Sequence, residues 1–257
     1  MNRNESNPFK FSPSTWIVPL MLLFAMWFVF YVDLFFHLHL NNHGIAPRTL
    51  FGLQGILCSI FLHADLSHIA NNSLPLLILT TALIYFYREV ALKVLVFGIL
   101  LSGFITWIIG RESIHIGASS LIYVLVSFIF FKGTLTAYYR LMALSLAVVL
   151  LYGGMIWYVF PEVDKNISWE GHLAGLITGF VFAIYFKTPN YAKEIQYDWE
   201  KPNFNPDDDD FMKHFDENGN FVNLPKADEI AVEHEEVVSQ PIQYVYVFKE
   251  NNKEELN

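Results

Sequence analysis

Three groups of polar residues stand where long apolar segments begin. The first contains His68 and Asn72, the second contains Ser119, and the third contains His172. Hydrocarbon penalises polar side chains, so such positions mark candidate functional sites. A serine becomes a nucleophile when histidine takes its proton, and amide or imidazole donors can stabilise the resulting oxyanion. These residue types predict acyl transfer by Ser119 and His172, with His68, Asn72 and backbone N–H groups as donors.

Six apolar segments must position these residues. They run over residues 16–36, 68–87, 91–109, 117–131, 140–160 and 171–186. Most approach the roughly 20 residues that cross a bilayer core, while the fourth and sixth, at about 15–16 residues, give some 23 Å of helix. A short helix can begin below the membrane surface where its end lines a wet cavity. We therefore expect an all-α, multi-pass integral membrane protein.

The basic residues of the loops predict the orientation of these segments. One set of loops contains Arg3, Lys10, Arg88, Lys93, Lys132, Arg140, Lys187 and Lys193, whereas the opposite set contains only Arg48, Arg111 and Lys165. The positive-inside rule then places both termini in the cytoplasm. The second, fourth and sixth segments all begin at the outer face, so their polar groups share one depth and can converge. Six spans without an added helix suit a bacterial inner membrane.

Helical spacing favours this convergence. Asn72 follows His68 by four residues, so the two lie on one face. Tyr123 follows Ser119 at the same interval. The sixth segment has a doubled small-xxx-small pattern that lets two backbones come close: Gly171, Gly175 and Gly179. If the neighbour is the fourth segment, Ser119 and His172 can come within hydrogen-bond reach.

The sequence favours a dyad over a triad. Glu170, two residues from His172, faces elsewhere on a helix, and no other acidic partner is evident. Lys132 stands 13 residues after Ser119, about 20 Å along a helix, which disfavours a serine–lysine dyad. Four more histidines are expected to be interfacial or simple loop residues: His37, His39, His43 and His115.

Composition divides the chain into parts. Hydrophobic residues make up 54% of it, yet residues 187–257 hold 7 Lys/Arg against 17 Asp/Glu. We expect a cytoplasmic N-terminal segment over residues 1–15, a membrane domain over 16–187 and an acidic, flexible cytoplasmic tail over 188–257. The run 243–248 alternates like a strand, but the role of the tail stays open. No basic patch suits a nucleic acid, and the single cysteine, Cys58, allows no intramolecular disulfide.

The polar groups together resemble the motifs of the rhomboid family. The stretch from His63 through His68 to Asn72 is similar to the family's H-x4-H-x3-N motif. Gly117-Ala-Ser119 resembles its G-x-S motif, and the stretch from His172 to Gly179 resembles its H-x2-G-x3-G motif. Residues 44–63 are similar to the first loop of bacterial members, and the resemblance covers about residues 16–187.

The resemblance implies a six-helix rhomboid-like bundle and an intramembrane serine endopeptidase that cleaves membrane-spanning segments of other proteins. It implies Ser119 as nucleophile and His172 as general base, with His68 and Asn72 stabilising the oxyanion. Supporting roles would fall to three further residues: Tyr123 packed on the His172 ring, His63 helping to hold the loop beneath the site, and Gly117. It implies no metal and no cofactor. Ser120 departs from the glycine that many members carry after the nucleophile, and its side chain could narrow the site.

Three other functions fit these residues less well. A rhomboid-like binding protein that holds membrane clients without cleaving them has no chemical reason to keep both Ser119 and His172. A metal or haem protein is disfavoured because His63 and His68 are five residues apart, not the three or four that share a helical face, and because H-E-x-x-H is absent. A transporter is disfavoured because neither an inverted repeat nor a chain of buried carboxylates is evident.

Overall fold

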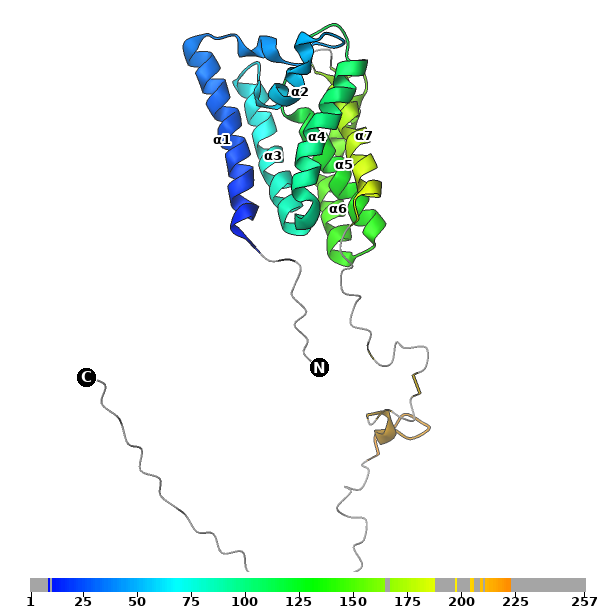
Figure 1. Ribbon diagram of the computed structural model, residues 1–257. Helices are drawn as coiled ribbons and strands as arrows, with labels where there is room; N and C mark the ends of the chain where they lie inside the picture. The colour runs from blue at the N-terminus through cyan, green and yellow to red at the C-terminus, as the bar shows by residue number, and fades with distance from the viewer. Residues whose placement is uncertain are drawn as a thin grey trace, which may run out of the picture. The chain divides into compact units, whose positions relative to one another are not determined.

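The chain forms two units, Met1–Ala192 and Lys193–Asn257. The computed structural model describes residues 9, 11–164, 167–187, 197, 204–205, 209 and 211–222. The described part of the first unit is a bundle of long helices (Figure 1): α1 (Pro13–Phe36), α3 (Leu66–Phe86), α4 (Arg88–Ile109), α5 (Ser119–Thr136), α6 (Tyr139–Tyr152) with the 3₁₀ helix η4 (Gly153–Val159), and α7 (Trp169–Tyr185). This confirms the prediction of an all-α membrane bundle.

Short connections make the helices alternate in direction. Tyr87 alone joins α3 to α4, and Ala137, in the left-handed conformation at φ 52°, turns the chain from α5 into α6. As a result α3, α5 and α7 all begin at one end of the bundle, which we call the site end (Figure 1). The opposite end, where α1 and α4 begin, is called the amino-terminal end.

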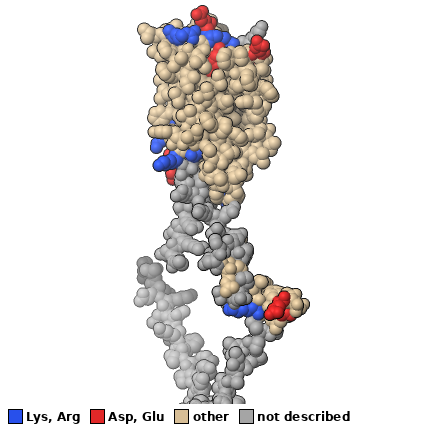
Figure 2. Space-filling view, turned by 90° about the vertical axis from the view of Figure 1, so that its right-hand side faces the viewer, with Lys and Arg blue, Asp and Glu red and all other residues tan. Residues whose placement is uncertain are grey.

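Within the described residues, five helical segments are long and apolar enough to cross a membrane: Pro13–Phe36, Leu66–Phe86, Arg88–Ile109, Ser119–Thr136 and Tyr139–Val159. The sixth, α7, has 17 residues. On the face of the bundle shown in Figure 2, the charged side chains gather at the two ends and leave an uncharged belt between them. Such a belt is what a bilayer core requires.

One predicted boundary is wrong. The fourth segment was expected to end at residue 131, before a lysine, but α5 continues to Thr136 and is 18 residues long. The helix can continue through Lys132 because the lysine ammonium donates hydrogen bonds to the carbonyls of Ala183 (3.0 Å) and Phe186 (2.5 Å) at the end of α7. A charge that meets the carbonyl end of a neighbouring helix need not terminate its own.

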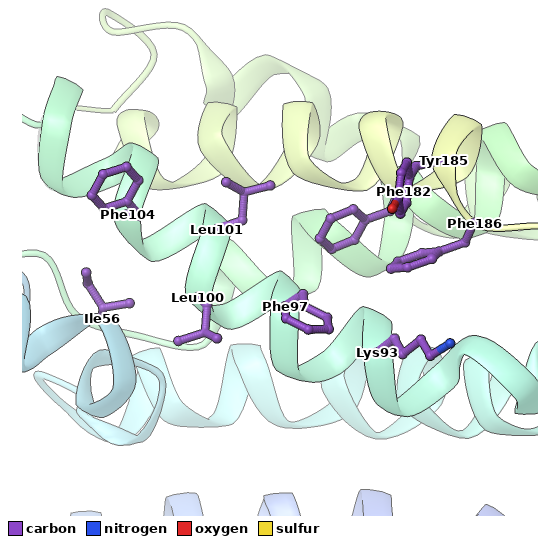
Figure 3. A pocket seen from close by; sticks show the side chains of 9 residues that line it. All are labelled: Ile56, Lys93, Phe97, Leu100, Leu101, Phe104, Phe182, Tyr185 and Phe186. Carbon is purple, nitrogen blue, oxygen red and sulfur yellow. The ribbon is translucent and has the colours of Figure 1, made fainter.

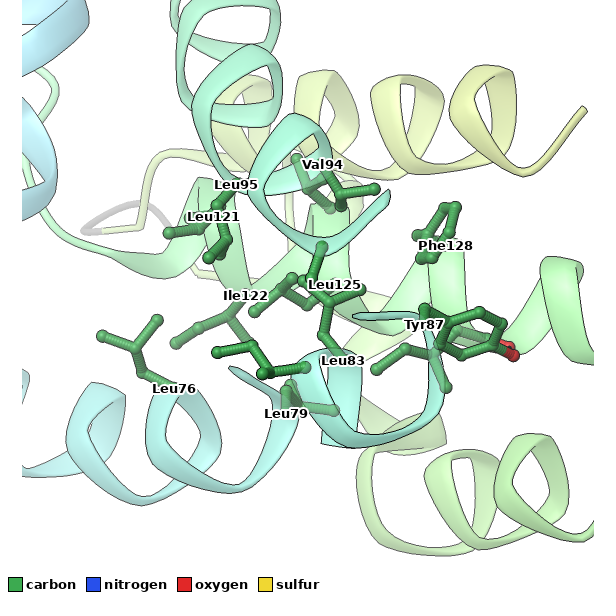
Figure 4. Close-up of a cluster of buried hydrophobic side chains, with 14 of the residues drawn as sticks. Leu76, Leu79, Leu83, Tyr87, Val94, Leu95, Leu121, Ile122, Leu125 and Phe128 are labelled. Atoms are coloured by element: carbon green, nitrogen blue, oxygen red, sulfur yellow. The ribbon is translucent and has the colours of Figure 1, made fainter. Parts of the chain in front are cut away.

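The buried core lies where α3, α4 and α5 meet (Figure 4). Leucines at intervals of three and four residues along α3 form one wall of it: Leu76, Leu79 and Leu83. From α5, Leu121, Leu125 and Phe128 pack against them, and all three are fully buried. This i, i+3, i+4 pattern packs one face of α5 firmly into the core. The core thereby fixes the position of the helix that begins with Ser119.

The chain between α1 and α3 is more ordered than the sequence suggested. It contains the 3₁₀ helices η1 (Leu40–His43), η2 (Phe51–Leu53) and η3 (Ser59–Phe61) and the short helix α2 (Gly55–Cys58). Arg48 ties this segment to the end of α4 by donating to the carbonyls of Ile108 and Gly110. The helices of this segment are only three to four residues long. They are too short to produce a helical periodicity of apolar residues, so the sequence did not reveal them.

The second unit contains one described turn. Asp216 accepts hydrogen bonds from the backbone N–H groups of Asn218 and Asn220, and η7 (Met212–His214) precedes it. Residues 215 and 221 form an isolated bridge across the turn. The predicted strand at 243–248 lies outside the described residues.

Candidate active site

The starts of α3 and α5 meet at Gly117. This glycine has φ +107°, a conformation that side chains rarely adopt. A Cβ at this position would lie 2.6 Å from Nε2 of His68 and 3.5 Å from Nδ2 of Asn72. The glycine of the G-x-S motif is therefore required both by its backbone conformation and by the close approach of two potential donors. The imidazole and the amide both face the loop that leads into Ser119.

The starts of α5 and α7 meet along the glycine face of α7. A Cβ on Gly175 would lie 2.2 Å from the carbonyl oxygen of Ser120, and one on Gly179 would lie 2.3 Å from that of Val124. No side chain fits at either position, so the two backbones are in direct contact. This confirms the close approach predicted from the glycine spacing and identifies α5 as the neighbour.

His172 is held in one orientation by two contacts. Its Nδ1 lies 3.0 Å from the carbonyl oxygen of Tyr158, which can only accept, so Nδ1 carries the proton. Its ring stacks on Tyr123 with centroids 4.2 Å apart and planes 15° from parallel. The Tyr123 hydroxyl in turn donates to the carbonyl of Met155, at 2.5 Å. In the neutral ring this leaves the lone pair of His172 on Nε2.

Ser119 is the first residue of α5, one turn before Tyr123 and on the same helical face. The N-cap residue is Ala118, which has no side-chain acceptor. The first backbone N–H groups of a helix lack partners within it, so this end of α5 offers uncapped donors and the positive end of a helix dipole. Among the described residues the Ser119 hydroxyl makes no hydrogen bond, and its side chain is half-buried.

His63 lies beneath the two donors. Its Nε2 is 3.1 Å from the amide nitrogen of Asn72, and its ring is edge-on to His68 with centroids 4.9 Å apart. Burial, followed by the neighbouring His68, lowers the pKa of His63 to about 4, so its ring is neutral at pH 7 and can accept from the amide. Asn72 then uses one N–H on His63 and keeps the second for another acceptor.

A second polar network joins the loop before Ser119 to the start of α7. The buried side chain of His115 donates from Nε2 to the carbonyl of Arg111 (3.2 Å), and its Nδ1 accepts from the Ser168 hydroxyl (2.6 Å). That hydroxyl oxygen caps α7 by accepting the N–H of Gly171. The carboxylate of Glu170, only 1% exposed, accepts the backbone N–H of Arg111 and lies 3.8 Å from its guanidinium.

Sequence reasoning missed this network. His115 was expected to be an interfacial or simple loop residue. It does lie in a loop, but this loop folds inward and buries the side chain, which the sequence did not indicate. An isolated bridge with Ile45 fixes the inward path of the loop. Glu170 does face away from His172, as the helical spacing indicated, and its partner is Arg111. No sequence signal links Arg111 to Glu170, because they are 59 residues apart.

Ser120 lines a small polar pocket between this loop and α7, together with Ser59, Thr106, His115 and Ser168. A Cβ added to Gly171 would lie 3.8 Å from the Cβ of Ser120, which is an ordinary van der Waals contact. Ser120 therefore fits here without displacing α7. No three His, Cys, Asp or Glu side chains in the described part of the chain are grouped so that they could hold a metal ion.

Comparison with known proteins identifies a family. The model of the rhomboid domain family matches residues 51–188, which is more than half of the chain. Relatives include uncharacterized proteins of Mycobacterium tuberculosis and Mycobacterium bovis, 31% identical over 160 residues, and one of Mycobacterium leprae, 32% identical over 162 residues. The alignments cover 58% of this chain and 62–66% of those proteins, so the chain spans slightly less than two thirds of their length. The chain belongs to the rhomboid family.

Proposed function

We propose that this protein is a serine endopeptidase that cleaves the membrane-spanning segments of other proteins with a dyad of Ser119 and His172. The observation that carries the proposal is the orientation of His172. Its Nδ1 proton is committed to the carbonyl of Tyr158, and its ring stacks on Tyr123. The imidazole that carries the basic Nε2 is therefore fixed against Tyr123, and Tyr123 lies on the same face of α5 as Ser119.

In this mechanism Nε2 of His172 takes the Ser119 hydroxyl proton while Oγ attacks the scissile carbonyl. The His172 imidazolium then gives this proton to the leaving amine, and an acyl-enzyme remains. Water repeats the sequence, again with His172 as base, and releases the acid. No carboxylate is needed to orient the base, because the carbonyl of Tyr158 already fixes its tautomer.

The oxyanion would be bound at the start of α5. The free N–H of Asn72, the imidazole of His68 and the uncapped backbone N–H groups of α5 all face this region. Loss of one donor of this kind typically raises the barrier by about 3–4 kcal/mol. Gly117 keeps the space between these donors open, and His63 holds the amide of Asn72 in place.

The substrates would be transmembrane proteins, since the site lies at one end of a bundle with an uncharged belt. Both termini would lie in the cytoplasm, and the site would face the outer side of a bacterial inner membrane. The distribution of loop Lys and Arg supports this orientation.

Labelling with a fluorophosphonate probe tests the proposal without a known substrate. The purified protein in detergent would be compared with Ser119→Ala, His172→Ala and the neighbouring control Ser120→Ala. We expect the parent and Ser120→Ala to be labelled and the other two to be silent. Labelling that persists in Ser119→Ala would refute the assigned nucleophile. A folded parent that is never labelled, beside an active control protease, would instead indicate a protein that binds membrane clients without cleaving them.

A further inference from the structure

A long apolar groove lies on the outside of the bundle between α4 and α7, away from the proposed active site. Its volume is about 800 Å³, within the usual range for ligand sites. Phe97 and Leu101 of α4 lie across it from Phe182 of α7 and from Phe186, which follows α7, and Phe104 lies at the other end near Ile56 of α2 (Figure 3). Apart from one lysine, every residue that lines the groove is apolar or aromatic.

The length of the groove matches a single acyl chain. Lys93 and Phe104 line its two ends on α4 and are 11 residues apart, which is about 16 Å of helix. This is close to half of a hydrocarbon core of about 30 Å. A partner helix that crossed the whole membrane would need a face about twice as long. An acyl chain of one leaflet has the length of the groove.

The positive charge of Lys93, at the amino-terminal end of the groove, favours a lipid with an anionic headgroup. Lys93 is exposed and makes no ion pair among the residues that the structure describes. Its apolar stem borders the groove near the start of α4, so its ammonium can reach the membrane–water interface. Tyr185, which is 76% exposed, lies at the same end of the groove (Figure 3), and tyrosine is typical of the level of the lipid headgroups. A phosphate at this level would meet the ammonium of Lys93.

We propose that the groove binds an anionic phospholipid, with one acyl chain between α4 and α7 and its phosphate on Lys93. Such a lipid would bridge α4 and α7, the helix that carries His172. A ligand that binds only the folded protein raises its stability. Anionic lipid should therefore raise the melting temperature more than zwitterionic lipid with the same acyl chains.

Native mass spectrometry of the full chain tests this site. The protein would be titrated with phosphatidylglycerol or phosphatidylcholine of identical acyl chains. Lys93→Gln removes the charge, and Arg140→Gln removes a charge at the same end of the bundle but outside the groove. Leu101→Trp fills the groove, and Leu92→Trp places the same bulk on an exposed position of α4.

We expect Lys93→Gln to weaken phosphatidylglycerol binding about fivefold, the effect of one basic residue near an anionic surface, with little change for phosphatidylcholine. Leu101→Trp should reduce the binding of both lipids, and the two control variants should match the parent. An unchanged preference in Lys93→Gln would overturn the proposal. A second result would also overturn it: the parent forms a dimer, Leu101→Trp abolishes the dimer, and lipid binding stays the same. A second copy of the chain would then occupy the groove.

Discussion

The imidazole of His172 and the phenol ring of Tyr123 stack nearly parallel, with centroids 4.2 Å apart, so a ring of α5 supports the proposed base on α7. The 3₁₀ helix η4 holds both rings. Its residue Met155 accepts the Tyr123 hydroxyl, and Tyr158 accepts Nδ1–H of His172. Three segments distant in sequence therefore fix the orientation of one imidazole.

Two variants of Tyr123 separate the stack from the hydrogen bond. Tyr123→Phe loses only the bond to Met155, a net contribution of about 0.5–1.5 kcal/mol, so kcat/KM should fall less than about tenfold. Tyr123→Ala also removes the support of His172, and a misplaced base can cost roughly 100-fold. The measurement is cleavage of a transmembrane reporter in proteoliposomes. Equal rates for Tyr123→Ala and the parent would show that the stack does not position the base.

Gly117→Ala should inactivate the protein while leaving it folded. The new Cβ would lie 2.6 Å from Nε2 of His68, in a backbone conformation that alanine rarely adopts. We expect at least a 100-fold loss of fluorophosphonate labelling, because the donors and the start of α5 must move apart. Gly154→Ala is the matched control, since a Cβ there meets nothing within 4 Å. Normal labelling of Gly117→Ala would contradict the assigned geometry.

The sequence was informative where a pattern repeats within one helix. The glycines of α7 predicted a backbone contact, and alternating segments predicted that α3, α5 and α7 begin at one end. It failed where contacts join distant loops. Neither the ion pair of Glu170 with Arg111 nor the burial of His115 follows from spacing, because only the folded path of residues 110–118 brings these groups together.

Glu170→Gln should destabilise the start of α7. The buried carboxylate binds Arg111 through its backbone N–H and lies near its guanidinium. An amide keeps one acceptor but loses the charge, which typically costs about 1–3 kcal/mol. We expect a melting temperature several degrees lower in detergent, whereas Glu112→Gln, on an exposed loop position, should match the parent. If both variants melt like the parent, the ion pair does not anchor α7.

Lys132→Met should loosen the opposite end of α7. The ammonium donates to the carbonyls of Ala183 and Phe186, which no following turn of helix can satisfy. Methionine fills similar space without a donor. Hydrogen exchange of the amides at residues 183–187 should accelerate at least tenfold, while those around His172 should change little. Uniform protection in both proteins would mean that the lysine does not cap the helix.

Acid should weaken the contact between the loop before Ser119 and α7 through His115. Burial lowers the pKa of His115 below its usual 6.5, with a weaker contribution of the same sign from Arg111, while the carbonyl of Arg111 and the charge of Glu170 act in the opposite direction. The neutral ring accepts from Ser168 at Nδ1, and a protonated Nδ1 could not.

The direction in which the folding stability changes with pH follows from the difference in proton binding between the folded and unfolded chains. Above pH 6.5 the folded and unfolded chains both hold His115 neutral, so stability does not change. As the pH falls below 6.5 the unfolded chain binds a proton that the folded chain resists, so stability declines until the lowered pKa is reached. His63, with its pKa near 4, adds a decline of the same sign. Melting temperatures between pH 8 and pH 5 should therefore fall in the parent and fall less in His115→Gln, and parallel curves for the two proteins would exclude His115 as a source of the acid sensitivity.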